Sequence, residues 1–222
     1  MMRTLLAMAL AFSINDVSDL PLTEVPATGT SQQLALFLTG DGGWAGLDKG
    51  VSARFAERGI ATIGFDSRSY FWRKRTPEQA ARDIERVLRH YLSAWNKTQA
   101  MLVGYSFGGE VLPFIVNRLP QDLRNRIVTV TLLGPEPGTS FEVHLMDWLP
   151  GVGAGGMPVQ PEIQALGNIP VLCIYGEGEA GALCPQLPST LATVQRIGGG
   201  HHFGRDYTAL ADRILAFAAD MH

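Results

Sequence analysis

The chain has 222 residues, a hydrophobic content of 46% and a formal net charge of −3 at pH 7. This length is sufficient for one domain with a sizeable buried core, and the hydrophobic content excludes an intrinsically disordered chain. Because a nucleic-acid-binding protein needs a basic surface, the slightly acidic balance argues against a nucleic-acid partner.

The first residues resemble a short secretory signal. Arg3 is followed by about nine apolar residues, and small residues stand near the end of this run. An amphipathic or frayed N-terminus is the alternative interpretation. We expect residues 1–13 to be a signal for export and residues 14–222 to form a single domain. No other segment approaches the ~20 apolar residues of a membrane span.

Strand and helix candidates alternate along the chain after an extended segment at residues 19–25. The strand candidates are apolar runs at residues 34–39, 60–65, 99–104, 127–133, 170–175 and 192–197. The helix candidates are residues 47–58, 77–95, 107–118 and 207–219. This alternation indicates an α/β fold with a mostly parallel sheet and helices on both faces.

A Gly-x-Ser-x-Gly motif, from Gly104 to Gly108, stands between the third central strand candidate and the helix that follows it. A serine on such a sharp strand-to-helix turn has a strained backbone, and glycines two residues before and after it remove the crowding. The pentapeptide alone is modest evidence in a glycine-rich chain, but its position between strand and helix is the one the chemistry requires. We predict that Ser106 is a nucleophile.

A serine nucleophile needs a base and an acid that orients the base, in the chain order Ser, acid, His for this type of turn. Strand 170–175 leads into a loop with Glu177 and Glu179. We favour Glu179, because many such enzymes place the acid three residues after the glycine that ends the strand. Glu177 and, after the preceding strand, Glu136 are the alternatives.

Two adjacent histidines, His201 and His202, follow the last strand candidate. We favour His202 as the base because an aromatic residue, Phe203, comes directly after it, and His201 remains the alternative. Each predicted partner of the serine follows a strand, so the carboxyl edge of the sheet would gather them.

An oxyanion hole requires two backbone donors. One is expected to be the N–H of Phe107, the residue after the nucleophile. The second is expected in the loop from Gly40 to Trp44, which follows the first central strand, with Gly43 favoured and Trp44 next. A tight loop that merely opens a helix is the alternative.

The only two cysteines, Cys173 and Cys184, flank the loop that holds the predicted acid. In an oxidising compartment they would close a small loop around Glu179 and fix its carboxylate. Two unrelated buried thiols are the alternative. Export and a disulfide support each other.

Several motifs together resemble the bacterial virulence protein VirJ and its AcvB relatives, from about Leu34 to the C-terminus. They are Gly40-Asp41-Gly42-Gly43-Trp44, Ser69-Tyr70-Phe71-Trp72 with Thr76-Pro77, Gly104-Tyr105-Ser106-Phe107-Gly108, Val111-Leu112-Pro113-Phe114 and Gly200-His201-His202-Phe203. One departure is Gly178, which stands in the acid loop where the family pattern suggests another acidic residue.

The resemblance implies an α/β-hydrolase fold, a periplasmic location and hydrolysis of lysyl-phosphatidylglycerol to phosphatidylglycerol and free lysine. It also implies a link to lipid homeostasis and virulence, with secretion-system components as partners in some members. We expect neither a metal nor a cofactor, because a serine nucleophile suffices for an aminoacyl ester. The rival functions are a soluble carboxylesterase or thioesterase and a non-catalytic periplasmic adaptor.

For an aminoacyl phospholipid, the expected substrate contacts are Asp41, Trp44 and Arg73. Basic side chains that would hold the lipid phosphate, or form a solvated loop, are Arg68, Arg73, Lys74 and Arg75. Possible partners of a lysyl ammonium group are Asp41, Asp66 and Glu110.

Residues 134–168 stand where such hydrolases carry a short lid after the fourth central strand. Their large apolar side chains would face the membrane surface or pack on the domain; these are Phe141, Leu145, Met146, Trp148 and Leu149.

Overall fold

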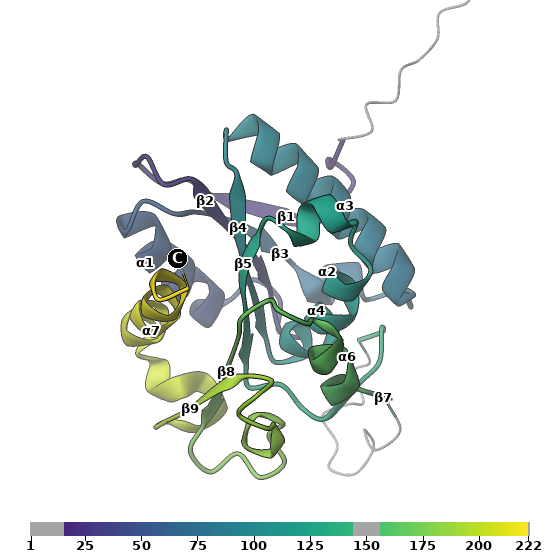
Figure 1. Cartoon of the computed structure of the whole chain (residues 1–222), viewed down its shortest axis with the longest axis vertical. Helices are drawn as coiled ribbons and strands as arrows, with labels where there is room; N and C mark the ends of the chain where they lie inside the picture. Colours follow the sequence, from purple (N-terminus) through teal and green to yellow (C-terminus); the bar gives the residue numbers. More distant parts are fainter. Residues whose placement is uncertain (1–15, 144–155, 222) are drawn as a thin grey trace, which may run out of the picture.

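The computed structural model describes residues 16–143 and 156–221 (Figure 1). The strands of the main sheet are β1 (Leu22–Val25), β2 (Gln33–Leu38), β3 (Ala61–Phe65), β4 (Gln99–Tyr105), β5 (Ile127–Leu133), β8 (Val171–Gly176) and β9 (Thr193–Ile197). The α-helices are α1 (Gly46–Glu57), α2 (Ser67–Tyr70), α3 (Pro77–Ala94), α4 (Phe107–Asn117), α5 (Gln121–Arg124), α6 (Val159–Ala165) and α7 (Tyr207–Ala219). Two 3₁₀ segments span Cys184–Gln186 and Gly200–Arg205, and β6 (Gly138–Thr139) pairs with β7 (Met157–Pro158).

The main sheet has the strand order β1-β3-β2-β4-β5-β8-β9. All neighbouring strands are parallel except β1, which lies antiparallel to β3 at one edge. The predicted alternation and the mostly parallel sheet are therefore confirmed. From β2 the chain moves outward to β3 and then returns to form β4 on the other side of β2. Ligands of open α/β sheets bind at such a reversal point, outside the carboxyl ends of the strands.

Helices cover both faces of the sheet. Alternate residues of β2 point to opposite sides: Leu36 belongs to the core under α3 and α4, and Phe37 to the core under α1 and α7. Figure 1 shows α1 and α7 on one side and α3, α4 and α6 on the other. The apolar runs in the sequence follow directly from this burial on both faces.

Helix α3 begins as the sequence predicts, with Thr76 as its cap and Pro77 in the first turn. The Thr76 hydroxyl accepts a hydrogen bond from the Gln79 N–H at 3.2 Å, and the Gln79 side chain accepts one from the Thr76 N–H at 2.9 Å. This reciprocal pair satisfies two backbone donors that the helix itself leaves unpaired.

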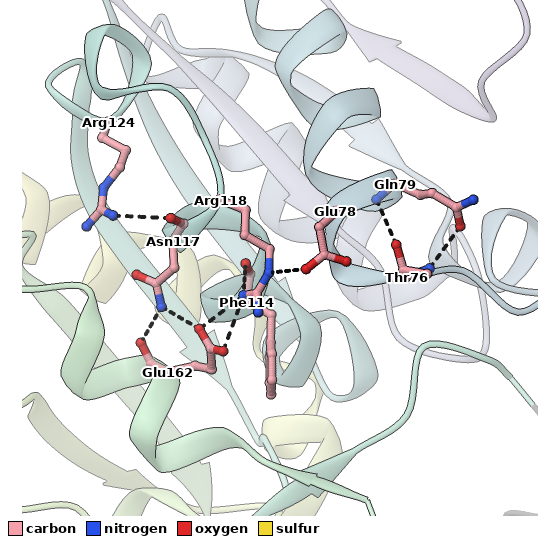
Figure 2. A network of polar contacts seen from close by, with 8 residues as sticks. All are labelled: Thr76, Glu78, Gln79, Phe114, Asn117, Arg118, Arg124 and Glu162. Atoms are coloured by element: carbon pink, nitrogen blue, oxygen red, sulfur yellow. Dashed lines mark hydrogen bonds and ion pairs between the residues drawn. The ribbon is translucent and has the colours of Figure 1, made fainter.

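The far end of α4 is fastened to α3 and α6 by a polar network (Figure 2). The Arg118 guanidinium contacts Glu78 at 2.9 Å and Glu162 at 3.2 Å. The Asn117 amide also donates to Glu162, at 2.6 Å. Because α4 begins at the predicted nucleophile, these contacts hold the helix that carries the site.

The segment expected to form a lid is described only in part. Phe141 is buried, with its ring centroid 5.6 Å from those of Phe71 and Phe114. It therefore packs on its own domain and does not face a membrane. The other apolar side chains expected there, at positions 145, 146, 148 and 149, lie outside the described residues, as does the expected signal at residues 1–13. Among the helices that the structure describes, none has the length and apolar character to cross a bilayer.

Candidate active site

Ser106 lies at the tip of a sharp turn between β4 and α4, with φ 51° and ψ −122°. A Cβ atom on Gly104 would lie 2.5 Å from the Gly108 carbonyl oxygen, and one on Gly108 would lie 2.3 Å from the Leu38 carbonyl oxygen. Both positions therefore require glycine. The Ser106 N–H donates to the Leu133 carbonyl at 2.7 Å, which holds the strained residue in place.

The structure joins a serine, a histidine and a glutamate, the three side-chain types that the sequence predicts for the site, in one series of contacts. The Ser106 hydroxyl lies 2.9 Å from His201 Nε2. The other ring nitrogen, His201 Nδ1, pairs with Glu179 Oε1. This is the arrangement in which a histidine takes the serine proton while a carboxylate fixes its orientation.

His201, and not His202, faces the serine, so the geometry favours the alternative to the histidine that the sequence favoured. The exposed His202 turns its Nδ1 to the Tyr105 hydroxyl, at 3.0 Å. The two neighbours lie on a tight 3₁₀ turn, where consecutive side chains point in different directions, so only one can reach the nucleophile. Phe203 is buried in the core beside α1 and α7, and its anchoring decides which histidine is presented.

Glu179 occupies the acid position that the sequence favoured. Burial raises the pKa of its carboxyl group, but hydrogen bonds from His201 and the Gly176 N–H outweigh burial and leave the pKa below its ordinary value. Glu177 is exposed and lies 3.6 Å from Arg196, and the side chain of Glu136 is exposed as well. Neither alternative contacts His201.

A disulfide between Cys173 and Cys184 closes the loop that carries Glu179. Both cysteines are fully buried. The loop is also fixed by a hydrogen bond of 2.9 Å from the Leu183 N–H to the Pro135 carbonyl. Of the two interpretations that the sequence left open, the structure has the disulfide.

The expected oxyanion donors have different surroundings. The Phe107 N–H, at the start of α4, makes no hydrogen bond within the described residues and remains a candidate donor. Gly43 does not fit the role, because its N–H already donates to the Gly40 carbonyl at 3.1 Å in a tight turn. Gly40 is the residue that packs against the serine, since a Cβ on it would lie 3.4 Å from Ser106 Cβ. The neighbouring Asp41 N–H, without a partner in the described chain, replaces Gly43 as the candidate second donor.

The three residues expected to contact the substrate have different surroundings in the structure. The Trp44 ring packs across Gly64 of β3 and edge-on to Phe37, so its placement gives no support to a substrate contact. Asp41 is partly buried in the loop beside the serine. Arg73 is exposed on the turn between α2 and α3, and no hydrogen bond or ion pair joins it to Ser106, His201 or Glu179.

Glu110 is a buried carboxyl group one helical turn after the nucleophile. Its pKa is raised to about 8, chiefly by burial and also by the nearby carboxylates of Glu136 and Asp41, against the effect of a hydrogen bond with Thr139. Its side chain also accepts a hydrogen bond of 3.4 Å from the Glu136 N–H. The sequence suggested Glu110 for a cationic ligand but gave no sign of its burial. In the part of the chain described, no group of His, Cys, Asp or Glu is suited to hold a metal ion.

Replacing Glu110 by Gln should stabilise the protein progressively as the pH rises. The native group keeps its proton up to pH about 8, whereas the unfolded one ionises near its ordinary value of 4.5. The unfolding free energy of the wild type therefore decreases as the pH rises from 4.5 to about 8, by several kcal/mol at most. Urea unfolding at a series of pH values checks this, with Glu177→Gln at an exposed site as the matched control. An equal pH dependence in wild type and Glu110→Gln would contradict it.

Replacing both cysteines by alanine should lower the stability of the protein and make the loop that carries Glu179 more mobile. Loss of the crosslink is expected to cost about 2–4 kcal/mol of unfolding free energy. Below the melting temperature, the ester hydrolysis that the sequence predicts should also slow, because Glu179 is no longer held against His201. A double-mutant cycle with Glu179→Gln measures this. If the disulfide acts through Glu179, breaking it in the Gln background causes little further loss, and a full additional loss there contradicts the explanation.

Comparisons with known proteins agree with the fold. The profile of the family described as "Bacterial virulence protein (VirJ)" matches residues 32–221. Among curated proteins, no relative matches the sequence. Among solved structures, MenH from S. aureus is similar with a TM-score of 0.67 and 17% identity, covering 90% of this chain and 98% of that one. Est1E from Butyrivibrio proteoclasticus is similar with a TM-score of 0.66 and 16% identity, covering 93% and 96%. The naproxen esterase (carboxylesterase NP) from Bacillus subtilis is similar with a TM-score of 0.62 and 14% identity, covering 88% and 87%. The predicted α/β-hydrolase fold is confirmed.

Proposed function

The chain belongs to the VirJ family of bacterial virulence proteins, and from this premise we propose that it is a serine ester hydrolase. The observation that carries the proposal is the continuous chain of contacts from the Ser106 hydroxyl through His201 to Glu179. A structural serine on a strained turn does not need a histidine at hydrogen-bonding distance, or a half-buried carboxylate behind it.

The proposed reaction has two steps. In the first, His201 takes the Ser106 proton as the hydroxyl attacks the ester carbonyl, and the N–H groups at the start of α4 and in the Gly40 loop stabilise the oxyanion. His201 then protonates the leaving alcohol oxygen. In the second step His201 activates a water molecule, which releases the acid and restores the serine. Glu179 stays ionised and stabilises the histidinium in both steps.

The proposed substrate is the aminoacyl ester of lysyl-phosphatidylglycerol or a related aminoacyl lipid. The family resemblance suggests it, and the charges around the site support a cationic acyl group. Tyr105 directly precedes the nucleophile, and burial raises its pKa, with the carboxylates of Asp48, Glu179 and Asp41 adding to the effect. Asp41, in the loop that packs against Ser106, is the carboxylate placed to attract an ammonium group and to disfavour an anionic acyl group.

A periplasmic location is part of the same proposal, and the Cys173–Cys184 disulfide supports it, because such bonds persist in oxidising compartments. Secretion-system components are proposed partners on the family resemblance alone.

A soluble carboxylesterase is the second candidate function, favoured by the similarity in fold to Est1E and the naproxen esterase. A non-catalytic adaptor is the third, and the assembled triad argues against it.

Purified protein should release free lysine from lysyl-phosphatidylglycerol vesicles, and the Ser106→Ala variant should not. Chromatographic detection of lysine over time measures the release. Hydrolysis of a short soluble ester without any release of lysine would favour the carboxylesterase. A folded wild type that cleaves neither substrate would favour the adaptor.

Replacing each of the two histidines by alanine in turn tests which of them is the base. His201→Ala should lower kcat by on the order of 10⁴, because the serine loses its proton acceptor. His202→Ala should cost less than about tenfold, because it removes only the contact with Tyr105. The kcat values of the two variants on the same ester check this, with thermal melting as a folding control. A larger loss in His202→Ala would contradict the assignment.

A further inference from the structure

The turn between α2 and α3 carries a large apolar side chain on the molecular surface. Trp72 is 50% exposed. The other large hydrophobic side chains exposed in the described chain are Met157 and Met221, at 37% and 42%. Trp72 is thus the most exposed of them and the only aromatic one. A single exposed apolar side chain is common on protein surfaces, but a half-exposed indole offers a large apolar area to a partner.

The turn is a firm platform for this side chain. The preceding Phe71 is fully buried, and its ring packs edge-on to those of Tyr70 at 4.8 Å and Phe107 at 5.2 Å. Its N–H donates to the Ser67 carbonyl, and its carbonyl accepts from the Val143 N–H, both at 2.9 Å. The exposure of Trp72 therefore results from a well-packed backbone.

Three exposed cations stand close to Trp72 in the chain, two directly after it and one on α2 four residues before it. Arg68, Arg73 and Lys74 are exposed and make no ion pair with any described residue. Other arginines are paired with carboxylates, as Arg54 is with Asp212, whereas Arg126 and Arg213 are exposed without an ion pair to any described residue. The turn differs from both because three such cations stand within seven residues of the chain. We call Arg68, Trp72, Arg73 and Lys74 the Trp72 surface. It is a local concentration of positive charge on a chain whose net charge is −3.

The Trp72 surface borders the active site. Phe107 follows the nucleophile directly and packs on Phe71, the neighbour of Trp72. The turn also lies at the carboxyl edge of the sheet, since it comes after β3 and the short α2. A large partner bound to Trp72 would therefore meet the protein beside Ser106.

We propose that the Trp72 surface docks the protein on an anionic phospholipid bilayer, with the indole among the lipid headgroups and the three cations on lipid phosphates. The choice of a bilayer rests on the proposed lipid substrate and on the composition of the surface. Tryptophan is enriched at the membrane–water boundary, and basic side chains bind anionic leaflets. A protein interface would instead need an apolar core depleted of charge, whereas here a single indole stands among cations. Docking in this orientation brings the mouth of the site to the headgroup layer, where an aminoacyl ester of a lipid lies.

Vesicle binding tests this without any turnover if all proteins carry Ser106→Ala. Cosedimentation is measured with vesicles of phosphatidylglycerol and phosphatidylethanolamine, and with vesicles of phosphatidylcholine alone. Two variants alter the surface, Trp72→Ala and the double variant Arg73→Gln/Lys74→Gln. Their matched controls are Met221→Ala, another exposed apolar side chain, and Arg126→Gln/Arg213→Gln, which removes the same charge from exposed positions away from the turn. Circular dichroism and melting temperatures establish that each variant is folded.

We expect binding to the anionic vesicles only, weakened by salt. Each surface variant should lower the apparent affinity by roughly tenfold or more, and the controls should bind like the parent. Absence of binding by the parent overturns the proposal and leaves an acidic protein as the occupant of the surface. Equal loss in the surface and control charge variants overturns it too, because binding would then follow net charge alone. Because binding is measured on an inactive serine variant, its outcome is independent of whether the protein proves to be a hydrolase.

Discussion

The site depends on one close backbone approach, at which α4 begins so near to β2 and β4 that no side chain fits between them. Gly108 lies directly against the Leu38 carbonyl, and Gly104 against Gly108. This contact places the first turn of α4 at the point where the strand order reverses. Ser106 then stands at the carboxyl edge with a positive φ, a strain that costs about 1–3 kcal/mol and that the surrounding packing must offset. The first N–H groups of α4 face the same edge, where a developing negative charge is stabilised.

Two further loops complete the site, and each is held by contacts of a different kind. The acid loop is closed by a covalent bond, between Cys173 and Cys184. The histidine loop is held by packing: the Tyr105 ring lies 5.2 Å from that of His201, and its hydroxyl lies 3.2 Å from the His201 carbonyl oxygen. The loops also touch, since a Cβ on Gly176 would lie 2.0 Å from the Gly200 carbonyl oxygen. Strand β4 therefore leads directly into Ser106 and, through Tyr105, supports His201.

Buried carboxyl groups near the site oppose folding and shape its electrostatics. Burial raises the pKa of Asp48 to about 6 and that of Glu110 to about 8. Asp48 has a local structural role, because its carboxylate accepts a hydrogen bond of 2.9 Å from the Ala45 N–H at the start of α1. Glu110 has no such capping role, and its burial favours the protonated form. Glu110 lies one helical turn after Ser106 and keeps its proton up to pH about 8, while the cations of the Trp72 surface are exposed. The carboxylates of Asp41 and Glu179 thus lie at the candidate site, and the exposed cations lie on the adjoining turn.

The sequence alone determined the features that depend on neighbours along the chain. These are the alternation of strands and helices, the cap at Thr76, the glycines around Ser106 and the acid three residues after Gly176, because each is a local pattern with a local physical cause. Tertiary structure decided the rest. His201 and His202 follow the same strand, and only the anchoring of Phe203 and the contact with Tyr105 decide which one reaches Ser106. Gly43 has the expected position in its loop, yet its N–H already donates a hydrogen bond within the turn. The Trp44 ring packs on the sheet at Gly64, where no side chain stands in its way. Local pattern fixes which residues are near a site, but the direction of each side chain and the partner of each N–H depend on packing between distant segments.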